Sequence, residues 1–406
     1  MVINLMIDEN KYYRNFYILN LFLALCMFLN IVILKGNRDK YLGILICVYL
    51  SFIVSNRILN KKLFKCDESL SLIINVLILI SIIMLYRINR HIAMKQCFFI
   101  VIGYISYLLI MFYVKDINEF YKYKVIYFIL TAVFMSLSFF FGKYINGSKN
   151  WVSLFGITFQ PSEFGKIFLI LYISSLFKNE ITFKDITMVT CLFLLIFGCF
   201  ILQKDLGTLL IIFLTTLFIY YIKTGNNKIL IFSFLFLALS AIVSYKLIPH
   251  VKVRIDAWLF PHKDPFGVSY QVLQGFFSMG YGGFLGKGLY YGSLEFIPVN
   301  YTDYIFVSIV EEFGIITGII ITMFYFIFFL RIIIKIFTSE NNKSSILILI
   351  LGFTLLISIQ AILILGGIIN LIPLTGVTLP FVSYGGSSII SLFIIFSLMQ
   401  KVLKEF

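Results

Sequence analysis

Long apolar runs separated by short polar connections extend over the whole chain. Most runs have about 18 residues or more, which as a helix is enough to cross a hydrocarbon core of about 30 Å. The pattern predicts about twelve transmembrane helices, near residues 17–34, 41–56, 69–86, 97–114, 125–142, 163–177, 183–202, 205–222, 228–247, 304–334, 345–371 and 384–402. The first run lacks a small-residue cleavage site, so we interpret it as a retained helix. The predicted fold is an all-α polytopic membrane protein.

The composition agrees with this interpretation. Of 406 residues, 61% are hydrophobic and 13% are charged, and the mean hydropathy is +1.00. A soluble protein of this length would need more polar surface. The net charge of +14 comes from Lys and Arg residues spread over short loops. This favours contact with anionic membrane lipids at the interface, and we expect no nucleic-acid partner.

The cysteines and histidines predict no metal site. The six cysteines have no CxxC spacing, and most lie inside apolar runs, where a thiol packs as a small hydrophobic group. The three histidines, His91, His250 and His262, are scattered along the chain. A structural disulfide framework or a histidine-based metal centre is therefore not expected.

Charge in the connections predicts the orientation. Basic residues mark three short connections, which are 178–184, 223–228 and 331–343. The positive-inside rule places them in the cytoplasm, together with both termini of a chain that has an even number of spans. Three segments rich in Pro and Gly then face outward together: 143–161, 248–303 and 371–383. Irregular backbone at membrane depth survives where it lines a cavity or is buried in protein, so we expect the active face to be the outer one.

Acidic residues at the start of an apolar span call for a physical reason. Asp303 stands where the span begins, and Glu311 and Glu312 lie within it. A carboxylate in such a place costs several kcal/mol unless it is compensated. The simplest explanation is a polar cavity near Asp303. The two glutamates lie roughly 12 Å deeper along the helix, where we expect them to hold neighbouring helices or to shape the cavity.

Two polar motifs mark helix starts, and each has two interpretations. Pro161 and Glu163 are typical of a first helical turn, but Lys166 lies one turn into an apolar helix, which favours a functional Glu163–Lys166 pair facing a cavity. The motif Gln203–Thr208 lies between two spans. It is either a tight turn in which Asp205 caps the second helix or part of a site, and these interpretations are compatible.

The long segment 248–303 carries Arg254, Gln271 and a series of glycines around Lys287. Glycines allow the backbone to approach a ligand closely, and with Lys287 they could cradle a phosphate. The residue order of a P-loop is missing, so a flexible loop is an equal alternative.

The last polar stretch, Pro373–Ser388, interrupts the hydrophobic chain with two prolines, three glycines and six hydroxyl groups. It predicts a re-entrant element that ends where a helix begins at the serines.

Taken in order, these motifs resemble those of the SEDS family, the shape, elongation, division and sporulation proteins of the RodA, FtsW and SpoVE type. The agreement covers roughly residues 146–402 and is carried by Gln160–Lys166, Gln203 with Asp205–Thr208, Gly280–Gly288, Thr302–Asp303, Glu311–Gly314 and Pro373–Ser388. The family usually has ten spans, so the resemblance implies an extra N-terminal pair here. Residues 1–142 would be N-terminal transmembrane helices partly outside the family core. Residues 143–406 would form the catalytic core, with the large loop 248–303 before the third-last helix.

The resemblance implies a peptidoglycan glycosyltransferase that polymerises lipid II at the outer face of the bacterial cytoplasmic membrane, with a class B penicillin-binding protein as its transpeptidase partner. The family's essential aspartate falls on Asp303, the expected catalytic residue. Its membrane-embedded aspartate falls on Asp205, and its Glu–Lys pair on Glu163 and Lys166. The candidate substrate-binding residues are Glu163, Lys166, Gln203, Asp205, Arg254, Gln271, Lys287, Thr302, Thr375, Ser383, Tyr384 and Ser387. A divalent cation, Mg or Mn, could share in holding the diphosphate, although no ligand cluster demands one.

Four positions depart from the family pattern. Asn150, Lys204, Val299 and Tyr301 stand where Arg, Pro, Glu and His or Gln, respectively, are common. These departures leave open a catalytically weak scaffold for a penicillin-binding protein. Buried charges and broken helices also suit a lipid II flippase or another transporter. Against transport, no inverted repeat is evident and the polar motifs gather at one face.

Overall fold

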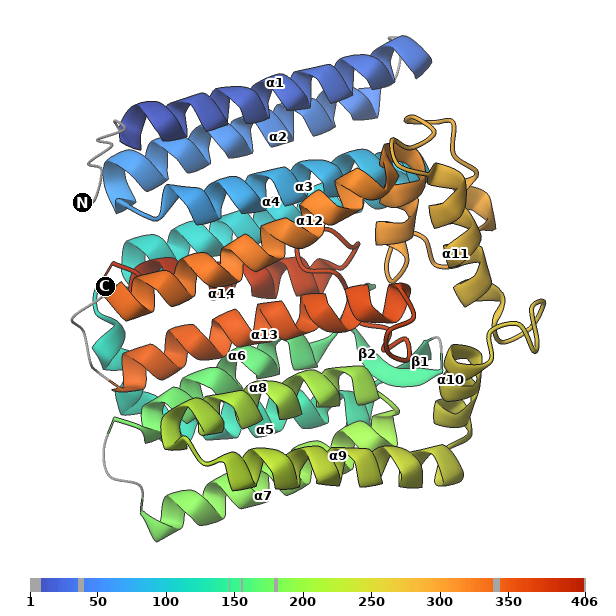
Figure 1. Cartoon of the computed structure of the whole chain (residues 1–406). Helices are drawn as coiled ribbons and strands as arrows, with labels where there is room; N and C mark the ends of the chain where they lie inside the picture. The colour runs from blue at the N-terminus through green and yellow to red at the C-terminus, as the bar shows by residue number, and fades with distance from the viewer. Residues whose placement is uncertain are drawn as a thin grey trace, which may run out of the picture.

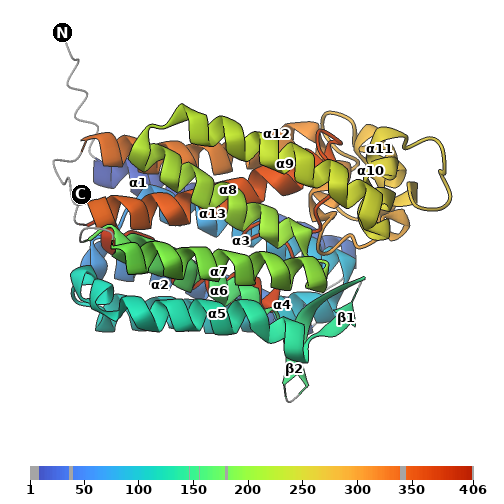
Figure 2. The ribbon, with the colours of Figure 1, turned by 90° about the horizontal axis from the view of Figure 1, so that it is seen from below.

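The computed structural model describes residues 9–35, 40–145, 147–154, 156–178, 182–338 and 344–404. Long helices run side by side in a bundle (Figures 1 and 2). They are α1 (Glu9–Lys35), α2 (Lys40–Ile58), α3 (Glu68–Ile88), α4 (Arg90–Tyr113), α5 (Lys124–Phe141), α6 (Pro161–Leu176), α7 (Phe183–Gln203), α8 (Leu206–Thr224), α9 (Asn227–Leu247), α12 (Ile305–Thr338), α13 (Ser344–Ile368) and α14 (Gly386–Val402). The short helices are η1 (Leu59–Phe64), η2 (Ile117–Tyr123), α10 (Pro249–Leu259), α11 (Tyr270–Gly282) and η3 (Leu294–Phe296).

Each predicted span corresponds to a helix. Within the described residues, ten helices are long and apolar enough to cross a membrane. The other two predicted spans are shorter: α14 has 17 residues and α6, which carries Glu163 and Lys166, has 16. The prediction of an all-α polytopic membrane protein is confirmed.

The polar segment 143–161 contains strands that the hydrophobic pattern did not predict. An antiparallel sheet in the order β1 (Lys143–Ile145), β2 (Ser148–Leu154) and β3 (Ile157–Phe159) precedes α6. Gly147 and Gly156 lie in the two turns with φ of 84° and 83°, a conformation that favours glycine. Strands this short carry too few alternating positions to reveal a period of two.

The three segments predicted to face outward meet at one end of the bundle, here called the loop end. In Figure 1 it is the side with β1, β2, α10 and α11, and the opposite, terminal end is the side where α12 and α14 end. Arg254 on α10 donates to the carbonyls of Leu374 and Thr375 at 3.3 and 3.2 Å. The Tyr384 amide donates to the Tyr301 carbonyl at 2.9 Å. The side of the membrane that this end faces stays a prediction.

Ion pairs join the largely buried α3 to α12 at both ends. At the terminal end, Asp67 pairs with Arg331 Nε at 3.1 Å and with Lys335 Nζ at 2.8 Å. At the loop end, Arg87 Nε pairs with Glu312 Oε1 at 2.7 Å. Because each carboxylate is almost fully enclosed, removal of its cation would leave an uncompensated buried charge.

A break in α12 is filled by the residues that directly follow α11. Gly314 has φ 86° and ψ 165° inside the helix, which frees amide groups that the helix would otherwise use. The Ile315 amide donates to the Gly283 carbonyl at 2.9 Å, and the Ile316 amide donates to the Phe284 carbonyl at 3.3 Å. The irregular backbone is therefore satisfied by protein, as membrane depth requires.

The two glutamates of α12 hold the segment that follows α11. Glu311 Oε1 accepts from the Ser293 amide at 2.5 Å, and Glu312 Oε1 accepts from the Tyr290 amide at 3.2 Å. The part of this segment around Lys287 is therefore held to α12 by hydrogen bonds.

The break predicts a strong requirement for glycine at one position. A Cβ on Gly314 would lie 2.2 Å from the Phe284 carbonyl oxygen, and the positive φ adds backbone strain. We expect Gly314→Ala to lower the stability of the purified protein by about 2 kcal/mol or more, measured by thermal unfolding in detergent. Gly280→Ala is the matched control, because a Cβ there meets no atom within 4 Å. Equal melting temperatures for the two variants would contradict this account of the break.

Candidate active site

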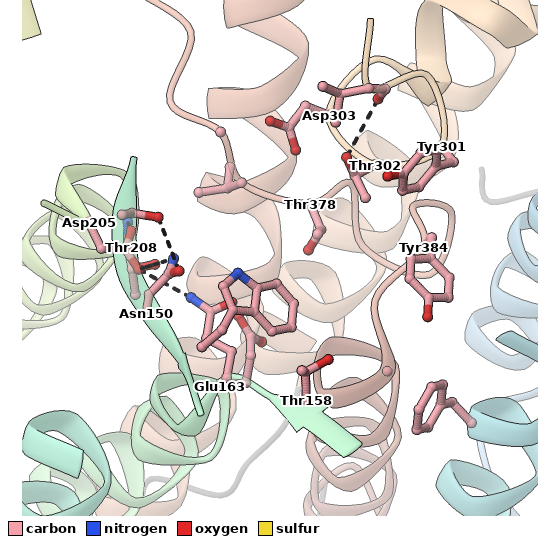
Figure 3. Close-up of a pocket in the computed structure, with 18 of the residues that line it drawn as sticks. Asn150, Thr158, Glu163, Asp205, Thr208, Tyr301, Thr302, Asp303, Thr378 and Tyr384 are labelled. Carbon is pink, nitrogen blue, oxygen red and sulfur yellow. Dashed lines mark hydrogen bonds between the residues drawn. The ribbon is translucent and has the colours of Figure 1, made fainter. Parts of the chain in front are cut away.

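A cavity of about 680 Å³ lies at the loop end (Figure 3). Its walls come from α4, the β2–β3 region, the starts of α6 and α8, α10 and the segments that precede α12 and α14. Seven of the predicted site residues line it: Glu163, Lys166, Asp205, Arg254, Thr302, Asp303 and Tyr384.

A tight turn before α12 carries Asp303. The Val299 carbonyl accepts from the amides of Thr302 and Tyr304 at 3.2 and 3.4 Å. Val299 has φ 54°, a left-handed conformation that costs a β-branched residue of order 1–3 kcal/mol. This strained turn presents Val299, Thr302 and Asp303 to the cavity.

The Asp303 carboxyl lies close to Arg254 across a glycine. An added Cβ on Gly376 would lie 3.6 Å from Asp303 Oδ2 and 3.5 Å from Arg254 Nη2, so only a residue without a side chain leaves this space open. Burial raises the pKa of Asp303 to about 6, against the lowering effects of the Arg254 charge and a hydrogen bond from Thr302. A carboxyl in this range is suited to exchanging protons near neutral pH.

Asp205 is the centre of a second polar cluster. Its Oδ1 accepts from the Thr208 amide at 3.2 Å, and it thereby caps α8. Its Oδ2 accepts from the Thr208 hydroxyl, Asn150 Nδ2 and Gln160 Nε2 at 3.0, 3.0 and 3.1 Å. Asp205 thus both caps α8 and lines the cavity, so the two interpretations stay compatible. Asn150 supplies a neutral donor to this carboxylate.

The Glu163–Lys166 pair forms a third cluster, and Figure 3 shows Glu163 below Asp205 and Asp303. Lys166 Nζ lies 2.8 Å from Glu163 Oε1 and donates to Gln360 Oε1 at 3.3 Å. Glu163 Oε2 accepts from the Ser391 hydroxyl at 3.1 Å. Gln360 in turn donates to the Thr378 carbonyl at 2.8 Å. The pair therefore links α6 to α13, α14 and the segment before α14 at the cavity wall.

Three predicted site residues support the cavity without lining it. Gln203 is buried and donates to the Met135 carbonyl at 3.1 Å. The Ser383 hydroxyl donates to the Thr302 carbonyl at 2.6 Å, next to Asp303. The Ser387 hydroxyl accepts from the backbone amide of Gln160 at 3.1 Å.

Three others lie away from the cavity lining. Lys287 is exposed, with its ammonium 4.0 Å from the centre of the Tyr281 ring. Gln271 is half-buried on α11, and Thr375 lines a neighbouring apolar groove between α8, α9 and α10. The structure does not bring Lys287 to the place where it could cradle a substrate phosphate in this cavity.

Sequence reasoning missed several lining residues: Lys95, Trp151, Thr158, Gln360 and Thr378. Gln360 is a lone amide inside an apolar helix, which is a usable signal of a buried polar contact. Lys95 sits near the start of α4 and resembles an ordinary interfacial lysine, so nothing local distinguished it.

Comparisons with known proteins place this architecture in a family. The FtsW/RodA/SpoVE family profile, described as "Cell cycle protein", matches residues 63–406. RodA of Mycobacterium tuberculosis, named a peptidoglycan glycosyltransferase, is 29% identical over 334 residues, which are 77% of this chain and 71% of that protein. FtsW of Wigglesworthia glossinidia brevipalpis, named a probable peptidoglycan glycosyltransferase, is 34% identical over 290 residues, or 68% of this chain and 75% of that one.

Two solved structures share the fold. A chain of a peptidoglycan synthase complex, described as coordinating polymerization and crosslinking, superposes with a TM-score of 0.72 at 22% identity. The RodA rod-shape-determining protein of Thermus thermophilus gives 0.60 at 20% identity. Each comparison covers 84% of this chain and 98% of the other.

The fold and cavity are those of a polytopic membrane protein with a polar site at one end of its helix bundle. The chain belongs to the FtsW/RodA/SpoVE family, the SEDS proteins, and the resemblance seen in its motifs is confirmed. The family match begins at residue 63, so α1 and α2 precede it. The division into regions 1–142 and 143–406 stays a prediction.

The environment of Asp303 predicts a carboxyl that titrates near pH 6. Infrared titration should show this carboxyl band in the wild type, its loss in Asp303→Asn, and a higher pKa in Arg254→Gln, because the arginine lowers it. Glu295→Gln, an exposed acid in the same segment, is the control and should leave the band unchanged.

The raised pKa of Asp303 also makes the stability of the folded protein depend on pH. The folded protein binds the Asp303 proton more tightly than the unfolded chain, whose ordinary pKa is 3.8. This contribution is fully present below pH 3.8 and is lost as the pH rises through about 6. The melting temperature of the wild type should therefore fall relative to Asp303→Asn across that window. A difference that does not vary with pH would refute the raised pKa.

Proposed function

We propose that this protein is a peptidoglycan glycosyltransferase that transfers glycan from lipid II to a growing glycan strand. The observation that carries the proposal is Asp303, held by a strained turn in a polar cavity beside Arg254 at the loop end. Family membership and the names of the curated relatives support the same activity.

In the proposed reaction, the acceptor hydroxyl oxygen attacks the anomeric carbon of the donor sugar. A new C–O bond forms, the bond to the diphosphate oxygen breaks, and the hydroxyl proton passes to the Asp303 carboxylate. A sugar hydroxyl is a weak acid, so the base contributes chiefly by close positioning. Attack opposite the leaving group would invert the anomeric centre.

Cationic side chains of the cavity would stabilise the departing diphosphate. Arg254 offers a planar donor that can bind phosphate oxygens in a bidentate manner, and Lys95 adds a second charge at the lining. Lys166 is already paired with Glu163. Its proposed role is therefore to keep the cavity wall in place, and not to bind the diphosphate. Thr302 and Tyr384 would contact the sugars, and the lipid tails would remain in the membrane.

A divalent cation would need ligands from the substrate. The described residues contain no group of three or more His, Cys, Asp or Glu residues placed to hold a metal. Asp303 and Asp205 reach the cavity from separate segments, so the diphosphate would have to complete a coordination shell. The steps proposed above use only side chains of this chain.

The proposed setting is the bacterial cytoplasmic membrane, with the loop end facing outward and both termini in the cytoplasm. Basic connections at the terminal end support this orientation. A class B penicillin-binding protein is the proposed partner. The support is a similar chain that forms part of a complex described as coordinating polymerization and crosslinking.

The decisive test is polymerisation of lipid II by purified protein, alone and with a co-expressed class B penicillin-binding protein. Asp303→Asn should reduce chain formation by about two to four orders of magnitude, the typical contribution of a general base. Its melting temperature at neutral pH should be no lower than that of the wild type, because the variant lacks the buried charge. Its membrane insertion should be unchanged. Glu295→Gln is the matched acid-to-amide control and should retain activity.

Other outcomes would point to the rival functions. Proteoliposomes that move labelled lipid II across the bilayer without forming polymer would indicate a flippase. Absence of polymer with every partner, together with stable binding of the penicillin-binding protein, would indicate a scaffold. Full activity in Asp303→Asn would overturn the assignment of the base while leaving the glycosyltransferase activity in place.

A further inference from the structure

A second polar pocket lies at the terminal end, far along the bundle from the candidate active site. It has a volume of about 220 Å³ and lies where η1, the start of α3, and the last turns of α12 and α14 meet. Its lining is dominated by charged side chains: Lys65, Asp67, Glu68, Arg331, Lys335 and Lys404. Nothing in the proposed reaction uses this pocket.

The charges in the pocket do not balance. Four cations face two carboxylates, so the formal surplus is +2. Asp67 is nearly enclosed and accepts from the Ser69 and Leu70 amides as well as from Arg331 and Lys335. Burial alone would raise its pKa, but the hydrogen bonds from Lys335 and Ser69 and the two positive charges lower the pKa to about 2. This carboxylate is therefore ionised, and its oxygens already accept hydrogen bonds from groups of the protein.

The cations retain capacity for another anion. The side chains of Arg331 and Lys335 are still 40% and 29% exposed although both contact Asp67. Lys65 and Lys404 have no carboxylate within ion-pair distance in the part of the chain that the structure describes. A free ammonium has three donors, and a guanidinium can hold two oxygens of one phosphate.

We propose that this pocket binds the phosphate headgroup of an anionic membrane phospholipid. Its volume is below the range of roughly 300–1,000 Å³ that is usual for larger organic ligands, and it suits a small headgroup. Basic pockets between transmembrane helices at the cytoplasmic side are typical of such binding.

The neighbouring surface favours a lipid over a free phosphate. Leu63 on η1 and Ile334 and Phe337 on α12 are exposed at 60%, 54% and 82%. These apolar side chains lie on the same elements that supply Lys65 and Lys335. A headgroup in the pocket would therefore place its acyl chains beside apolar surface.

The pocket joins the N-terminal helix pair to the family core. Tyr13 of α1 lines the pocket, and Lys65 follows η1, which continues α2. Arg331 and Lys335 come from α12, and Lys404 follows α14. A bound phosphate would bridge cations from three separate elements. The lipid would thus stabilise the attachment of α1 and α2 to α12 and α14.

The test compares the full-length protein in neutral detergent with added phosphatidylglycerol, with phosphatidylcholine, and with inorganic phosphate. Phosphatidylglycerol should raise the melting temperature in a saturable manner, and phosphatidylcholine should not. The double variant Lys65→Gln/Lys404→Gln should weaken the apparent affinity for phosphatidylglycerol about tenfold or more, because both side chains contribute charge without serving an ion pair. Its melting temperature without lipid should match the wild type.

The control variant is Lys184→Gln/Lys228→Gln. It removes two exposed lysines from the starts of α7 and α9, outside the pocket lining, and should respond like the wild type. If both double variants lost the same affinity for phosphatidylglycerol, the effect would come from general surface charge, and the proposal would be overturned. An equal stabilisation by phosphatidylcholine would overturn it as well. If inorganic phosphate raised the melting temperature and saturated at the same concentration, the pocket would be a site for a free anion, and the proposal of a lipid headgroup would be overturned.

Native mass spectrometry provides a second reading that is independent of unfolding. The wild type and the control variant should retain one more phosphatidylglycerol than the Lys65→Gln/Lys404→Gln variant after delipidation. If the double variant is unstable, the single variant Lys404→Gln serves, with a partial loss expected. Identical lipid retention in all variants contradicts the site.

Discussion

Two ion-pair clusters between α3 and α12, one at each end of α3, underlie the architecture. A charge in a bilayer is tolerated only when it is paired and enclosed by protein. Asp67 and Arg87 meet that condition by contacting partners on α12. The position of α12 along α3 is thereby fixed at both ends. Because Asp303 lies immediately before α12, the clusters also set the position of the candidate catalytic group.

The carboxylates of the cavity meet the same constraint in different ways. Glu163 is paired with Lys166, and Asp205 accepts four hydrogen bonds from neutral groups. Asp303 differs from both. In the described residues no cation lies within ion-pair distance of it, and in place of four neutral donors it has a hydrogen bond from Thr302. Its pKa is correspondingly raised. The acid with the fewest partners is the one available to exchange a proton, whereas the other two give the walls their shape.

The sequence predicted the helices well because a membrane span must be both long and apolar. It also indicated the polar motifs of the site, since charged residues such as Glu163 and Asp303 are costly in an apolar setting. It could not show that the glycines before Lys287 serve packing against the break at Gly314, because that contact joins α11 to α12. Lys95 was missed because it stands alone in an apolar helix, and only the tertiary fold brings it to the cavity. Thr378 lies in the polar stretch Pro373–Ser388, but the sequence does not show which of its six hydroxyl groups face the cavity.

The neutral surroundings of Asp205 give the cavity an electric polarity. Glu163 is offset by Lys166, and Asp303 lies near Arg254, whereas Asp205 is held by neutral donors and has no cation within ion-pair distance in the described residues. Lys95 on α4 contributes a positive charge elsewhere in the lining. A molecule that is anionic at one end and neutral at the other would enter with a preferred direction, its charged end turned away from Asp205. Asn150 donates to this carboxylate through a neutral amide, so this wall can orient a charged molecule that binds there.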